Sequence, residues 1–139
     1  MTPETMSKLS AQLVLDEGRR NKPYQDQFGK LTIGIGHNLT DNGLSDAVVD
    51  FIFKEDLAAV IADLDRELPW WSGMSESRQL VVADMCFNMG IRSLLGFHRT
   101  LAAMESGDFN AAADGMNESA WARQVPVRAA RLINLMRTG

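Results

Sequence analysis

The stretch PYQDQFGKLTIGIGH, residues 23–37, interrupts a chain whose other patterns are mostly helical. Residues 24–39 show short β-type alternation around Gly29, which predicts a small β-hairpin. Such a hairpin needs only its turn glycine and its alternating apolar residues. The hairpin does not require the polar side chains of Asp26 and Thr32, so these two residues are the first candidates for a functional site.

Helical spacing is found before and after the hairpin. The apolar residues Met6, Leu9, Leu13 and Val14 predict a first helix that ends at Glu17, with Gly18 just beyond it. A long amphipathic helix is expected from Ser45 to just before Pro69. The helix opened by Ser75 contains LVVADMCFNM, is apolar on nearly every side and stops at Gly90, which predicts a place in the middle of a domain. Shorter helices are expected near residues 98–106, 108–116, 118–124 and 126–136.

The fold class expected from these elements is α+β and mostly α, with one small sheet. A chain of 139 residues has the size of one compact domain and buries a sizeable core without disulfides. Its single cysteine, Cys86, lies in the apolar helix pattern. We expect an inert core thiol there, because apolar surroundings disfavour a thiolate.

The charge balance and the distribution of apolar residues argue against several classes of partner. With 14 Lys and Arg against 18 Asp and Glu, the net charge of −4 argues against nucleic acid. No apolar stretch approaches the roughly 18 residues of a membrane helix, so no stable membrane insertion is expected. The first residues have neither a basic segment nor an apolar run, which predicts a soluble cytoplasmic product without a signal peptide.

Two segments depart from the acidic average. Residues 17–32 contain the four bases Arg19, Arg20, Lys22 and Lys30 against two acids, and residues 119–139 contain four arginines and no acid. Either segment could present a positive field to an anionic ligand. Solvated faces of unrelated elements are the alternative interpretation.

Glu17 and Asp26 are a candidate pair for glycosidic bond cleavage. A carboxylate at the C-terminal end of a helix is disfavoured by the partial negative charge there, which favours a protonated general acid at Glu17. Asp26 lies in a polar, glycine-bearing turn and should stay ionised. Two carboxyl groups that ionise differently are the arrangement that glycoside hydrolysis uses. The hydroxyl of Thr32 could share a water with Asp26 from a strand of the same hairpin.

These residues carry a resemblance. The chain resembles the phage T4-type lysozymes, glycoside hydrolase family 24, whose signature is a Glu, eight residues, an Asp, five residues and a Thr. Glu17, Asp26 and Thr32 fit both spacings. Further matches lie in order along nearly the whole chain: Leu15-Asp16-Glu17-Gly18, Thr32-Ile33-Gly34-Ile35-Gly36-His37, Met85-Cys86-Phe87-Asn88-Met89-Gly90, Gly96-Phe97, Trp121, Pro126-Val127-Arg128-Ala129-Ala130-Arg131 and Arg137-Thr138-Gly139.

The resemblance implies a single lysozyme-like domain. It would have a small N-terminal β-hairpin lobe at about residues 15–50, a long connecting helix, and a C-terminal helical lobe at about 60–139 that includes the first helix. The implied activity is a muramidase that cuts the β-1,4 bond between N-acetylmuramic acid and N-acetylglucosamine in bacterial peptidoglycan with inversion. No cofactor and no metal is implied, and a monomer is expected. The enzyme would reach the wall by a holin-like route or by delivery with a virion.

The resemblance also implies supporting roles. Arg128 matches the arginine that pairs with the catalytic glutamate, and Asp84 would brace that arginine. Asn88 and Phe97 fall where the family lines its substrate cleft. His37 matches a histidine used in a buried ion pair, although an alanine such as Ala58 replaces the acid expected as its partner in the next helix. Simple helix packing is the alternative interpretation for Arg128, Asp84, Asn88 and Phe97.

Other interpretations stay open at the level of sequence. His37 with Asp26 and Asp41 would be a metal site without a supporting His or Cys nearby. Gly34-Ile35-Gly36 is a fragment of a dinucleotide fingerprint, although close packing explains the glycines better. A lytic transglycosylase would use the same acid with the sugar's own 6-hydroxyl in place of water, and a non-catalytic glycan-binding module would keep the fold without turnover.

Two features depart from the family. Only residues 41–44 separate Thr40 from the long helix, where the T4 enzyme has a longer lobe, so one wall of the cleft should be lower. The sequence pI of about 5.1 is the second departure, because many lysozymes of this type are basic. A weaker attraction to anionic peptidoglycan is the expected consequence.

Overall fold

The computed structural model describes all residues from 1 to 139. Its contacts divide the chain into two compact units, Met1–Phe51 and Ile52–Gly139. The boundary between them falls inside the long helix α3 (Asp46–Glu67). The first helix belongs by its contacts to the first unit, and its expected place in a helical lobe stays a prediction.

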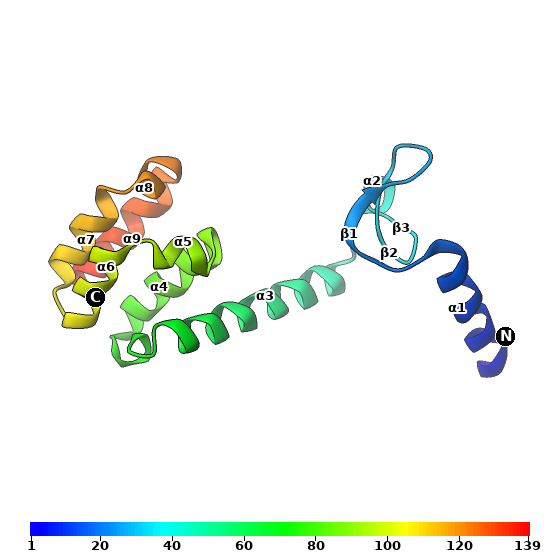
Figure 1. Cartoon of the computed structure of the whole chain (residues 1–139), viewed down its shortest axis with the longest axis horizontal. Coiled ribbons are helices and arrows are strands. Elements are labelled where there is room, and N and C mark those ends of the chain that lie inside the picture. Colours follow the sequence, from blue (N-terminus) through cyan, green and yellow to red (C-terminus); the bar gives the residue numbers. More distant parts are fainter. The chain divides into compact units, whose positions relative to one another are not determined.

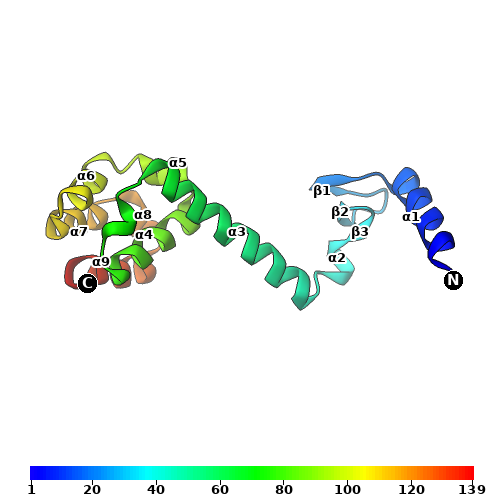
Figure 2. The ribbon, with the colours of Figure 1, turned by 90° about the horizontal axis from the view of Figure 1, so that it is seen from below.

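The first unit begins with α1 (Pro3–Glu17). Thr2 caps this helix by accepting a hydrogen bond from the backbone N–H of Thr5, and Pro3 occupies the first turn, where its missing N–H costs nothing. A three-stranded antiparallel sheet and a one-turn helix follow: β1 (Arg20–Gln25), β2 (Leu31–Gly34), β3 (His37–Asn38) and α2 (Leu39–Asn42), seen together in Figure 2.

The sheet has the order β1-β2-β3, so β1 is an edge strand. Tyr24 faces Thr32 across the first pair of strands, and Arg20 faces Gly34. The register is irregular between these two pairs. The predicted hairpin around Gly29 is therefore confirmed, but it begins earlier than expected and has a third strand that the alternation did not indicate.

The second unit is a bundle of helices (Figure 1). After α3 come the 3-10 turn η1 (Trp71–Gly73), α4 (Glu76–Met89), α5 (Ile91–Leu95), α6 (His98–Ser106), α7 (Phe109–Asn117), α8 (Ala120–Gln124) and α9 (Pro126–Thr138). The predicted helices are confirmed within a few residues, whereas α2 and α5 are too short for periodicity to reveal. No helix has the length and apolar character needed to cross a membrane.

The core of the second unit is built around α4. Val81, Val82, Met85 and Cys86 are buried on it, so its predicted central position is right for one face. The expectation of burial on nearly every side is wrong, because Leu80 is 61% exposed. Cys86 is a free, buried thiol, and its burial, with a smaller effect of the negative charge of Asp63, raises its pKa. The expected core position of Cys86 is confirmed, and its lack of reactivity stays a prediction.

Candidate active site

Asp26 is held by its own turn between β1 and β2. Its Oδ1 accepts hydrogen bonds from the backbone N–H groups of Phe28 (2.8 Å) and Lys30 (2.9 Å), and its carbonyl oxygen accepts one from Gly29 (3.0 Å). An aspartate that bonds the backbone two and four residues ahead fixes a tight turn, and Gly29 supplies the positive φ of +74° that the turn requires. These bonds engage Oδ1 and leave Oδ2 without a partner in the chain.

Thr32 is tied to the same turn through Lys30. Only 4% of Thr32 is exposed, and its hydroxyl donates to the carbonyl oxygen of Lys30 at 3.0 Å. The backbone N–H of Asp26 donates to that same oxygen at 2.9 Å. Because its hydrogen is used in this bond, the hydroxyl of Thr32 can interact with a water only as an acceptor. Asp26 and Thr32 thus share one backbone anchor.

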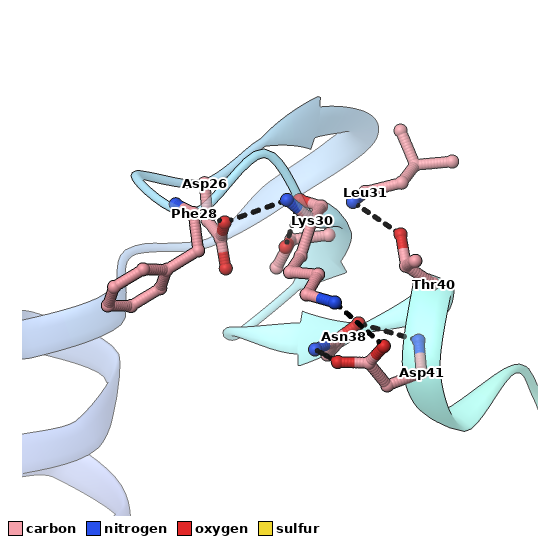
Figure 3. Close-up of polar contacts among 8 residues, drawn as sticks. Asp26, Phe28, Lys30, Leu31, Asn38, Thr40 and Asp41 are labelled. Carbon is pink, nitrogen blue, oxygen red and sulfur yellow. Dashed lines mark hydrogen bonds and ion pairs between the residues drawn. The ribbon is translucent and has the colours of Figure 1, made fainter.

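The side chain of Lys30 extends this arrangement to α2 (Figure 3). Its Nζ lies 3.0 Å from Oδ1 of Asp41, and Nδ2 of Asn38 donates to Oδ2 of Asp41 at 2.9 Å. The Lys30 bond, followed by the Asn38 bond, lowers the pKa of Asp41 below its ordinary value. The hydroxyl of Thr40 accepts the N–H of Leu31 at 2.7 Å. The sequence analysis missed Lys30 and Asp41 as supports of the turn.

Glu17 is the last residue of α1, and its side chain lies against the turn between β2 and β3. A Cβ atom added to Gly36 would stand 2.8 Å from Oε2 of Glu17. The expected close-packing role is therefore right for Gly36, whereas a Cβ on Gly34 would meet nothing within 4 Å. Within the first unit the side chain of Glu17 is exposed.

His37 does not have the role that the resemblance implied. It is exposed, and its Nε2 lies 2.6 Å from the carbonyl oxygen of Gly43, so a backbone hydrogen bond replaces the expected buried ion pair. This bond ties the end of the sheet to the segment after α2. The alternative metal site also fails, because Asp26 binds backbone amides and Asp41 binds Lys30. No three His, Cys, Asp or Glu side chains gather to hold a metal ion.

In the second unit, Asp84 and Arg128 form an ion pair between α4 and α9. Oδ1 of Asp84 lies 2.6 Å from Nε of Arg128, and the other carboxylate oxygen lies 3.7 Å from Arg131. Both partners of the first pair are half-buried. Because Asp84 takes only Nε, the two Nη groups of Arg128 keep their donors. The expected bracing of Arg128 by Asp84 is present.

Asn88 and Phe97 also belong to the second unit. Oδ1 of Asn88 accepts the indole N–H of Trp121 at 2.8 Å, which fixes the amide and leaves its NH₂ group free to donate. Phe97 and Trp121 line one hollow of this unit, together with residues of α6 and α7. The two residues therefore lie close to the same tryptophan, one bonded to it and one beside it.

Comparison with known proteins gives the family. The sequence profile described as phage lysozyme matches residues 15–134. The chain is 29% identical to the pre-baseplate central spike protein Gp5 of Enterobacteria phage T4, with 89% of this chain and 26% of that protein aligned. It is 25% and 24% identical to the probable T4-type lysozymes 2 and 1 of Dictyostelium discoideum, and 96% of each chain is aligned.

The chain thus spans about a quarter of the phage spike protein and nearly all of the two Dictyostelium proteins. The profile match covers most of the chain, including the first unit from Leu15 onward and the helical second unit through Asn134. The mostly helical fold with one small antiparallel sheet agrees with it. The chain belongs to the phage lysozyme family and is a glycoside hydrolase of the lysozyme type.

Proposed function

We propose that this lysozyme hydrolyses the β-1,4 bond between N-acetylmuramic acid and N-acetylglucosamine in bacterial peptidoglycan. Glu17 acts as the general acid, and Asp26 with Thr32 positions and activates the attacking water. The observation that carries the proposal is the single anchor of Asp26 and Thr32, the carbonyl oxygen of Lys30. A catalytic water needs two fixed partners, and this anchor holds both.

The hydrogen bonds of the turn support one choice of partners for that water. Oδ1 of Asp26 is occupied by two backbone N–H groups, so Oδ2 is the oxygen that takes a proton from the water. Thr32 has already donated its hydrogen, so it accepts the second hydrogen of the water. Both hydrogens of the water then point to the protein, and a lone pair of its oxygen is left for the anomeric carbon of the sugar.

Glu17 completes the reaction on the other side of the bond. Its proton passes to the glycosidic oxygen while the bond from that oxygen to the anomeric carbon breaks. The water oxygen bonds to the same carbon, and its proton passes to Asp26. Glu17 is the last residue of α1, and in this step its carboxyl donates from the protonated form.

Attack from the face opposite the leaving group inverts the anomeric carbon. In inverting enzymes the two carboxyl groups stand about 6.5–9.5 Å apart, a gap that admits a water, and we expect that separation between Glu17 and Asp26. Retaining enzymes have a shorter gap, because the second carboxylate itself attacks the sugar. The backbone-anchored turn around Asp26 favours a base that holds a water over a nucleophile that must reach carbon.

The second unit contributes substrate contacts in this proposal. The free NH₂ group of Asn88 donates to a sugar or acetamido oxygen, and the ring of Phe97 packs against the glycan. Arg128 is braced by Asp84 within the second unit, and its two Nη groups keep donors for an anionic or polar group of the substrate. The protein acts on the wall after release from the host cytoplasm or after delivery by a virion, and the likeness to a phage spike protein supports the second route.

Digestion of purified peptidoglycan tests the proposal. The soluble fragments are weighed by mass spectrometry, and proton NMR follows the first-formed anomer. Fragments with reducing N-acetylmuramic ends, first released as the α-anomer, are expected. Fragments lighter by one water would instead identify a lytic transglycosylase, and a β-anomer formed first would contradict inversion. Intact peptidoglycan after incubation would refute the substrate assignment.

A further inference from the structure

Strand β1 and the residue just before it carry a group of cations that the catalytic proposal does not use. Arg19, Arg20 and Lys22 are exposed and follow one another with no acidic residue between Gly18 and Gln25. We call these three residues the β1 cation cluster. The whole chain has a net charge of −4, so the cluster is a local exception to the acidic average.

The three cations have no carboxylate partner in the structure. The other bases of the first unit are paired, Lys8 with Glu4 at 3.1 Å and Lys30 with Asp41 at 3.0 Å. No ion pair forms at any member of the cluster, although the first unit contains enough acids to supply one. Unpaired charges that lie side by side repel one another, which a bound anion relieves.

The backbone gives the cluster a defined shape. The pairing of β1 with β2 is irregular between Arg20 and Tyr24, and the intervening residues bulge from the ladder. Residues 19–24 together line one hollow of the first unit. The guanidinium of Arg20 lies 4.8 Å from the ring centre of Tyr24, a cation–π contact that orders this side chain before any ligand arrives. Bulges of this kind often re-aim side chains beside active sites.

We propose that the β1 cation cluster binds the carboxylates of the peptide stems of peptidoglycan. A planar guanidinium donates two parallel hydrogen bonds to a carboxylate, and the ammonium of Lys22 adds a point charge. β1 ends one residue before Asp26, so Lys22 and Asp26 are separated by about 13 Å of extended chain. A stem held on β1 then lies within reach of a glycan strand bound at Asp26. The inference rests on peptidoglycan being the substrate.

Binding and cleavage are measured separately to test this site. The background variant Glu17→Gln keeps the sacculi intact, and cosedimentation with purified peptidoglycan gives the dissociation constant. In that background, Arg20→Gln with Lys22→Gln should weaken binding roughly three- to tenfold, the scale of two exposed ion pairs, and should lessen its dependence on salt. The matched control is Lys54→Gln with Arg92→Gln, which removes the same charges from exposed positions of the second unit.

Chemically modified walls identify the anion. Amidation of the stem carboxylates should weaken binding of the background protein and abolish its difference from the cluster variant. Removal of phosphate-containing polymers with hydrofluoric acid should leave binding unchanged, and a loss there would overturn the carboxylate assignment. Lys22→Gln alone should show part of the effect, and circular dichroism checks that each variant is folded.

Two results would overturn the site. If the cluster variant and its Glu17→Gln background bind equally, the cations do not bind the stems. Their role would then be to protect an edge strand against aggregation. Equal losses in the cluster variant and the matched control would show an effect of net charge. Failure of the proposed function is recognised differently, because the protein with an intact Glu17 would then release no reducing ends whether or not it binds.

Discussion

Thr32 donates its hydroxyl hydrogen to the carbonyl oxygen of Lys30 at 3.0 Å, and this bond fixes how the threonine meets a water. The same carbonyl accepts the N–H of Asp26, so one peptide group positions both proposed partners of the water. In the proposed mechanism, activation of the water depends on a short backbone turn as much as on the two side chains.

Replacing Thr32 with valine tests the role of its hydroxyl. Valine keeps the buried shape, and Lys30 keeps its bond from Asp26, so the free energy of unfolding should change by only about 1 kcal/mol. Hydrolysis should fall about 100-fold, because the water loses one of its two partners. Turnover of peptidoglycan is compared with Thr32→Ser as the matched control, which keeps a hydroxyl. A defect confined to substrate binding would count against water positioning.

Gly36 and Gly34 form a matched pair for testing the placement of Glu17. Both have positive φ, +67° and +70°, so alanine should cost each roughly 1–2 kcal/mol of stability. Only at Gly36 would the new methyl group push on the Glu17 carboxyl. Gly36→Ala should therefore lower turnover about 100-fold, since small displacements of reacting groups are costly, whereas Gly34→Ala should stay active. Equal activities in the two variants would show that this contact does not place the acid.

The Lys30–Asp41 ion pair should stabilise the fold around the Asp26 turn less at acidic pH than at neutral pH. Hydrogen bonds lower the pKa of Asp41 in the folded protein, so the stability they give is present above its ordinary value of 3.8 and is lost as the pH falls through the folded pKa. The melting temperature of the protein should exceed that of Asp41→Asn at about pH 6, and the difference should shrink towards about pH 3. A difference that does not vary with pH would exclude this ionic support.

Cys86 should be unreactive until the second unit unfolds. Its thiol is 2% exposed and its pKa is raised by burial, so both access and thiolate formation are opposed. Iodoacetamide at about pH 8 should leave the native protein unmodified and alkylate its single cysteine in urea. Mass spectrometry measures the label, and rapid labelling without denaturant would show that this part of the core opens.

Local chemistry predicts the helix bounds, whereas the catalytic roles of Glu17, Asp26 and Thr32 stay predictions from their spacing. Glu17, Asp26 and Thr32 have distinctive spacing, and the helix bounds follow from caps and glycines such as Ser75 and Gly90. Lys30 and Asp41 were not predictable, because their contact joins residues eleven positions apart through the fold of a small sheet. Asn38 gives a retrospective signal, since an asparagine three residues before an aspartate is a common helix-capping pattern.

His37 shows a limit of reasoning from resemblance. The family position that His37 matches implied an ion pair. In the structure, the ring of His37 bonds the carbonyl oxygen of Gly43 in the short segment after α2 instead. Burial of Glu17 depends on what covers the end of α1, which no local pattern specifies. The hydrogen-bond partner of His37 and the burial of Glu17 both depend on residues that are distant in sequence. Local sequence patterns give only the chemical type of each residue.

The most direct measurement of the central claim is the rate at which reducing ends are released from peptidoglycan by Glu17→Gln. Glutamine keeps the shape of the side chain but has no proton to transfer, so the folded variant should lose at least about 1,000-fold in rate. Glu4→Gln, the same substitution at the exposed opposite end of α1, is the control and should keep the rate of the unchanged protein. Near-normal release by Glu17→Gln would contradict its role as the acid.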